Sequence, residues 1–150
     1  MKLKLDKKFQ TMDVDAGDEL FPNGIFEFNI TKLIAYVRAN QDQFPIELVA
    51  LDTLWESPNE LGTSPFMPLD LTVPIIVAEI SPGRLNVIDG NHRVEEARRK
   101  GIKELSAYRV NPNQHRRFLT SVNAYTKFTE YWNSKVAEMS RATSRTVGSV

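Results

Sequence analysis

The chain has 150 residues, of which 41% are hydrophobic and 25% are charged, and its formal net charge at pH 7 is zero. This composition is ordinary for one globular domain. Because the sequence contains no cysteine, disulfide bonds, thiolate metal sites and a thiol nucleophile are excluded. It has neither an apolar run as long as a membrane span nor the apolar segment of a signal peptide, so we expect a cytoplasmic protein that does not bind membranes.

The charges are distributed unevenly along the chain. Residues 1–80 contain 6 Lys and Arg against 13 Asp and Glu, a balance of −7, and residues 81–150 contain 13 against 6, a balance of +7. Such a split can steer an anion toward one face of the protein, or the two halves can pack together with their charges intermixed. The sequence leaves both possibilities open.

The pattern of polar and apolar segments predicts one domain with an extension at each end. Residues 1–24 are polar and rich in turn residues, which predicts a loosely held N-terminal arm. A single domain is expected over residues 25–138. The last residues, 139–150, are polar and predict a flexible tail. Nothing in the sequence indicates an oligomeric state.

The first half of the domain is expected to contain a helix, a strand and a loop. Apolar residues at spacings of three and four predict a helix over residues 30–41. The sequence IELVALDTLW, residues 46–55, predicts a strand followed by a short helical turn. Proline and glycine punctuate residues 57–68, which predicts a loop.

The middle of the chain predicts a β-hairpin that leads into a helix. Residues 73–80 form a continuous apolar run with β-branched side chains, typical of a strand covered on both faces, and residues 85–89 form the return strand. A helix is expected from about Asn91 to Lys100, with Gly101 just past its end. The sequence ELSAYRV, which follows, predicts another short strand.

The C-terminal part of the domain predicts helices that cover the sheet. Residues 114–138 carry aromatic and apolar side chains at helical spacing, which predicts one long or two short amphipathic helices. Its aromatic residues, among them Trp132, are expected in the core rather than in a base-stacking surface. The fold class is therefore predicted to be α+β (α/β in some schemes), a small mixed β-sheet flanked by helices.

Two groups of polar residues are candidates for function. His115, Arg116 and Arg117 form a basic cluster that contacts phosphate or nucleic acid or lies in a solvated loop, and the solvated loop is the commoner outcome. The two histidines, at positions 92 and 115, do not have the acidic partners and spacing of a zinc site. The second group is DGNHR, residues 89–93, at the junction of the return strand and the helix.

The junction has the features of an anion site. The first N–H groups of a helix have no internal partners, and the helix dipole adds partial positive charge there. Gly90 allows the backbone to approach a ligand closely, and Arg93 offers a planar fork of donors. His92 can donate a hydrogen bond or move a proton, and Asp89 can hold Mg²⁺ or a ligand hydroxyl or orient His92. Alternatively, Asp89 only caps the helix, and His92 and Arg93 are exposed residues of its first turn.

The sequence VPIIVAEISPGRLNVIDGNHRVEEARRKGIKELSAYRV resembles the core of the ParB/sulfiredoxin superfamily, in which a strand pair leads into a Gly-x-x-Arg turn, a helix and a short strand. IELVALDTL is similar to the first strand and helical turn of that family, so the resemblance covers residues 46 to about 118. The form Asp-Gly-x-His-Arg is most similar to the kinase-like and stand-alone members with a ParB N-terminal-like domain.

The resemblance implies that the turn binds nucleotide phosphates. ParB proteins bind CTP there, sulfiredoxins bind ATP, and a related enzyme phosphorylates free serine. By this resemblance, the phosphate-binding residues are Gly90, Asn91, His92 and Arg93. The candidate catalytic residues are Asp89 and His92. A nucleoside triphosphate with Mg²⁺ held by Asp89 is the implied cofactor, and phosphoryl transfer or nucleotide hydrolysis the implied reaction. A nucleic-acid-binding or nuclease-like module and a non-catalytic binding domain are the alternatives.

The sequence departs from the family at two places. Sulfiredoxins carry their nucleophilic cysteine directly before the His-Arg pair, where this chain has Asn91, so it cannot repair sulfinic acids by that route. ParB proteins have a Glu-Asn-x-x-Arg box that engages magnesium and nucleotide, whereas the corresponding NPNQHRRF contains no glutamate. With its zero net charge, the chain is therefore expected to bind nucleic acid weakly at best.

Overall fold

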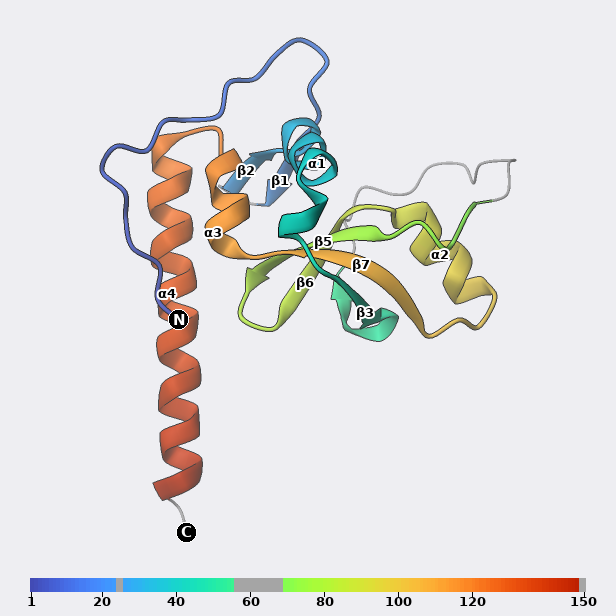
Figure 1. Cartoon of the computed structure of the whole chain (residues 1–150). Helices are drawn as coiled ribbons and strands as arrows, with labels where there is room; N and C mark the ends of the chain where they lie inside the picture. The colour runs from blue at the N-terminus through green and yellow to red at the C-terminus, as the bar shows by residue number, and fades with distance from the viewer. Residues whose placement is uncertain (24–25, 56–68, 149–150) are drawn as a thin grey trace.

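The computed structural model describes residues 1–23, 26–55 and 69–148 of the chain (Figure 1). Its helices, including the short 3₁₀ turns labelled η, are α1 (Ile30–Ala39), η1 (Gln41–Gln43), η2 (Leu51–Thr53), α2 (Asn91–Arg99), α3 (Pro112–His115), η3 (Arg116–Phe118) and α4 (Val122–Gly148). Its strands are β1 (Leu20–Asn23), β2 (Phe26–Asn29), β3 (Ile46–Ala50), β4 (Leu54–Trp55), β5 (Ile75–Ser81), β6 (Arg84–Asp89) and β7 (Glu104–Val110).

Five of these strands form a mixed sheet in the order β3-β7-β5-β6-β4. β5 pairs antiparallel with β6 and parallel with β7, and β3 joins the edge antiparallel to β7. The predicted α+β class, hairpin, following helix and last short strand are therefore confirmed. The separate antiparallel pair β1–β2 was not predicted, and the loop predicted over residues 57–68 lies outside the described residues.

The central strand β5 separates two hydrophobic cores. Ile75 and Val77 pack into a core with Val94 and Ala97 of α2. Alternate residues, such as Ile76, pack into a larger core with α1 and α4. Because successive side chains of a strand point to opposite faces, a continuous apolar run is what a strand between two layers requires. Figure 1 shows α4 and α2 on opposite sides of this sheet.

The N-terminal segment is held firmly against α4, so the expectation of a loosely held arm was wrong. The backbone of Leu3 exchanges two hydrogen bonds with the side chain of Asn133, and Trp132 Nε1 donates to the carbonyl of Met1 at 2.8 Å. The Phe9 ring stacks on Tyr125 with centroids 3.9 Å apart. The few apolar residues of this segment have no period, and only the helix surface they cover gives them a fixed place (Figure 1).

The last helix is longer than expected. α4 continues to Gly148, although the sequence predicts that the helices end at 138 and that a tail follows. Residues 139–147 contain neither proline nor glycine, so no residue there ends a helix. In Figure 1 this part of α4 projects beyond the sheet. Within the described residues, no helix has an apolar stretch of the length that a membrane span needs.

The basic cluster before α4 is mostly inside the protein. His115 is fully buried between the rings of Phe28 and Phe128, and its Nε2 lies 2.7 Å from the carbonyl oxygen of Glu79. Arg116 is also buried and donates to Thr129 Oγ1 at 2.9 Å. Neither residue belongs to a solvated loop, and the packing that buries them also keeps them from an external phosphate.

The buried histidine predicts a loss of stability in acid. Burial lowers the pKa of His115 from 6.5 to about 4, so below pH 6.5 the unfolded chain gains a proton that the folded protein does not. The free energy of unfolding should therefore fall by about 3 kcal/mol between pH 7 and pH 4 because of this residue. Urea unfolding of the wild type and of His115→Gln, which keeps a donor but does not titrate, measures the difference. Equal pH dependence in the two proteins would contradict the prediction.

Candidate functional site

The turn between β6 and α2 has the predicted strand-to-helix form. β6 ends at Asp89, Gly90 has a φ of +108°, and the first helical hydrogen bond runs from the N–H of Val94 to the carbonyl of Gly90 at 3.0 Å. A Cβ atom at Gly90 would lie 2.5 Å from Ile75 Cγ2 and 2.9 Å from Arg93 Nη2. Glycine is therefore required both by the backbone conformation and by the closeness of β5.

The first turn of α2 presents unused backbone donors. In the described part of the chain, no group accepts a hydrogen bond from the N–H of Asn91, His92 or Arg93. The N-cap residue is Gly90, which has no side chain, and the first turn contains no acidic residue. The alternative that Asp89 serves only as the helix cap is therefore wrong. The exposed donors and the helix dipole favour an anion at this place.

The carboxylate of Asp89 forms ion pairs with two arginines and does not cap the helix. Its Oδ2 lies 3.1 Å from Nη2 of Arg38 and 3.5 Å from Nη2 of Arg93. Arg38 comes from the last turn of α1, 51 positions away along the chain, and was not predicted. The side chain of Arg38 is 65% exposed, whereas that of Arg93 is only 15% exposed. The expectation that Arg93 is an exposed first-turn residue was therefore wrong.

Two side-chain atoms in the turn are buried without a partner. Asn91 Oδ1 and His92 Nδ1 make no hydrogen bond to any residue that the structure describes. Buried polar atoms are nearly always paired, and an unpaired one costs about 1–3 kcal/mol. Asp89 bonds to the arginines and not to His92, so the idea that it orients the imidazole finds no support. The unpaired atoms are consistent with a site that is completed by a ligand.

The charge of Arg93 also acts on Asp70, a carboxylate outside the turn. The pKa of Asp70 is lowered, first by hydrogen bonds from the side chain and backbone of Thr72 and then, to a smaller extent, by the charge of Arg93. Asp70 lies in the segment that precedes β5, and its hydrogen bonds are to Thr72 of the same segment. The ion pairs of the turn itself join one carboxylate, that of Asp89, to the two guanidinium groups.

The residues present do not form a ready magnesium site. In the chain as described there is no group of three or more His, Cys, Asp or Glu side chains that could hold a metal ion. Asp89 already bonds to two guanidinium groups through Oδ2, and a metal ion at that oxygen would have to displace them. Mg²⁺ commonly takes one or two carboxylates and completes its shell with ligand phosphates and water. The role of Asp89 as a magnesium ligand stays a prediction.

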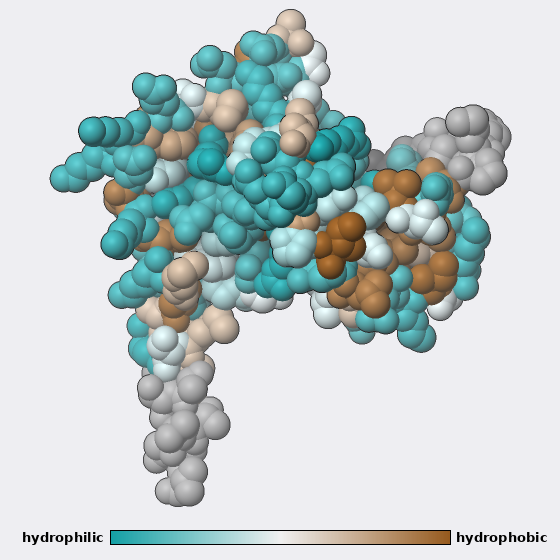
Figure 2. Space-filling model, viewed as in Figure 1, coloured by the Kyte–Doolittle hydropathy of each residue, from teal (hydrophilic) through white to brown (hydrophobic). Residues whose placement is uncertain are grey.

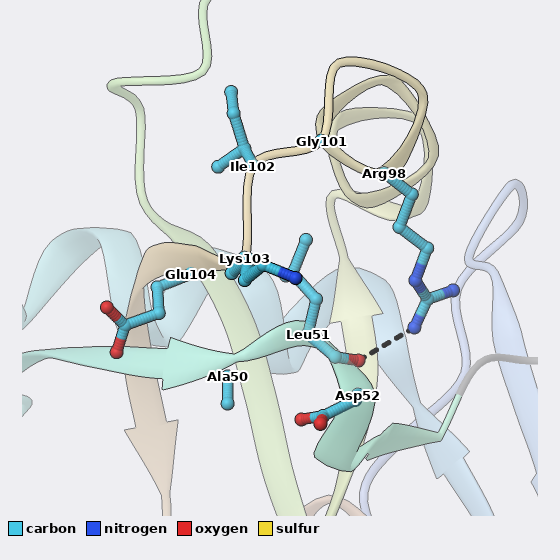
Figure 3. Close-up of a pocket in the computed structure, with 8 residues that line it drawn as sticks. All are labelled: Ala50, Leu51, Asp52, Arg98, Gly101, Ile102, Lys103 and Glu104. Carbon is cyan, nitrogen blue, oxygen red and sulfur yellow. Dashed lines mark hydrogen bonds between the residues drawn. The ribbon is translucent and has the colours of Figure 1, made fainter.

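A pocket of about 510 Å³ lies at the other end of α2 (Figure 3). Figure 3 shows Arg98 donating across it to the carbonyl of Leu51, at 2.7 Å. The residues that line it are Ala50, Leu51, Asp52, Arg98, Gly101, Ile102, Lys103 and Glu104. The pocket contains no residue of the turn 89–93 and was not predicted, because its lining comes from segments without a recognisable motif.

The likeness of this chain to known proteins lies in solved structures. No protein-family model and no curated protein matches the chain. Among solved structures, the chain is similar to the C-terminally truncated chromosome-partitioning protein ParB from Caulobacter crescentus, complexed with CTP-γ-S, with 18% identity and a TM-score of 0.34. The match covers 57% of this chain and 50% of the other, so this chain spans about half the length of the ParB chain. A likeness at this level assigns neither family nor function.

The contact between Gly90 and β5 predicts a specific loss of stability. Gly83 also has a positive φ, of +79°, but a Cβ there would meet no atom within 4 Å. Gly83→Ala should cost about 1–2 kcal/mol through backbone strain alone. Gly90→Ala should cost about 1–3 kcal/mol more, because its methyl group would overlap Ile75. Denaturant unfolding measures both variants, and an equal loss in the two would show that Ile75 does not confine the turn.

Proposed function

We propose that the turn formed by residues 89–93 binds the phosphate groups of a nucleotide or of another phosphorylated small ligand. The observation that carries this proposal is the meeting of three backbone N–H groups, which have no acceptor among the described residues, with the guanidinium groups of Arg38 and Arg93. Arg93 is largely buried and, toward the residues that the structure describes, uses one of its five N–H donors, on Asp89, so further donors are available to phosphate oxygens.

Asp89 holds the two arginines in place rather than neutralising the site. One carboxylate faces two guanidinium groups, so this cluster keeps an excess of one positive charge beside the helix N-terminus. A phosphate group that arrives there gains charge-assisted hydrogen bonds and meets donors that are already positioned.

A nucleotide is the proposed ligand because DGNHR resembles the Gly-x-x-Arg turn of the ParB/sulfiredoxin superfamily. Gly90, Asn91, His92 and Arg93 are the proposed phosphate-binding residues. For phosphoryl transfer or nucleotide hydrolysis, His92 is the proposed proton carrier, since its Nδ1 has no partner among the described residues. When bound, Mg²⁺ would neutralise the phosphate charge, and Asp89 is its proposed protein ligand through the carboxylate oxygen that does not pair with the arginines.

The proposal predicts that Arg93 contributes strongly to ligand affinity. Loss of its charge-assisted hydrogen bonds in Arg93→Ala should raise the dissociation constant by about tenfold to a hundredfold, since each such bond contributes about 1.5–3 kcal/mol. Arg93→Lys should recover only part of this, because an ammonium group lacks the planar fork. Calorimetric titration with CTP and ATP, with and without Mg²⁺, measures the constants at a temperature where every variant is folded.

Arg99→Ala is the matched control, because Arg99 carries the same charge at the opposite, C-terminal end of α2. It should bind as the wild type does. Since Arg93 is mostly buried, its variants should also melt at a lower temperature, and only the comparison of affinities tests the proposal. Equal affinity in Arg93→Ala and Arg99→Ala would contradict it. Tight binding to duplex DNA, with a salt slope of about −0.9 per phosphate contacted, would favour the nucleic-acid alternative instead.

A further inference from the structure

The edge strand β3 presents an uncovered row of apolar side chains. β3 stands at the end of the sheet order and, among the described strands, pairs only with β7. The side chains of Ile46 and Leu48 point to the same face and are 56% and 66% exposed. Figure 2 shows hydrophobic residues gathered over the part of the molecule where Figure 1 draws β3 and β7.

The strand lacks the features that usually protect a sheet edge. Its pairing with β7 runs in unbroken register from Ile46 to Ala50, without a bulge. Its one charged residue, Glu47, is engaged with Arg109 of β7 at 3.4 Å. Natural edge strands are commonly blocked by charges, prolines or bulges, because an open edge pairs with another strand. Here the only proline is Pro45, which precedes the strand.

One antiparallel register pairs all five residues of β3 with those of a second copy. When two copies pair about a two-fold axis, residues that lie opposite each other must point to the same face. A register with the axis at Leu48 sets Leu48 opposite its copy and Ile46 opposite Ala50. The register with the axis at Glu47 sets two carboxylates opposite each other, which is destabilising. The first register is therefore the one that the side chains favour.

We propose that two copies of this chain associate through β3 with Leu48 at the two-fold axis, which joins their sheets into one of ten strands. A second copy fits this edge because, in that register, the Ile46 and Leu48 side chains of each copy lie beside those of the other and cover them. The net charge of zero means that two copies do not repel each other as a whole. The turn at residues 89–93 does not take part in this contact.

Sedimentation velocity of the full chain over a range of concentrations tests the association. The wild type should sediment as a dimer of twice 17.1 kDa. Leu48→Asp places two carboxylates opposite each other and should sediment as a monomer at the same concentrations. Val122→Asp, at another exposed apolar residue (57%), is the matched control and should remain a dimer. A monomeric wild type would overturn the proposal, and β3 would then be open to pairing with a strand of a different protein. Equal dissociation of the Leu48→Asp and Val122→Asp dimers would also overturn it.

Single cysteines test the register, because the chain contains none of its own. Under mild oxidation, Leu48→Cys should form an intermolecular disulfide, since directly opposed Cβ atoms lie about 4.5–5.5 Å apart. Glu47→Cys should not, because its copy lies on the diagonal at about 7–8 Å. Non-reducing electrophoresis distinguishes the two results. Cross-linking of Glu47→Cys but not of Leu48→Cys would overturn the proposed register.

Discussion

The burial of β5 on both of its faces is the constraint on which the rest of the fold depends. Its alternate side chains enter two separate cores, one with α2 and the other with α1 and α4. Because Ile75 begins this strand, its side chain lies against Gly90 and leaves no room for a Cβ atom there. The same strand that organises the core thus fixes the place where the backbone turns into α2.

This arrangement brings both layers of the protein together at one carboxylate. α1 packs in one core and α2 in the other, and β6 ends between them at Asp89. Asp89 bonds to Arg38 from one layer and to Arg93 from the other. The proposed anion site is therefore a consequence of how the layers meet, and a change in the packing of either helix would move one of its two guanidinium groups.

The sequence predicted those parts of the molecule that local patterns determine. The hairpin, the turn and the start of α2 at Asn91 follow from an apolar run, an Asp-Gly pair and a helical spacing. Arg38 was missed because its place beside Asp89 depends on the packing of α1, and no local motif marks it. The burial of Arg93 and His115 was missed for the same reason, because polar side chains enter the interior only where tertiary contacts receive them.

The central claim is that the first three N–H groups of α2, which have no acceptor in the described part of the chain, bind the ligand. Titration of the isotope-labelled wild type with CTP, followed by amide NMR, tests this directly. The account predicts that the largest chemical-shift changes occur at the amides of Asn91, His92 and Arg93, because the bound phosphate would accept their hydrogen bonds. Saturable binding that leaves these three amides unchanged and shifts those around Leu51 and Ile102, in the pocket at the other end of α2, would contradict it.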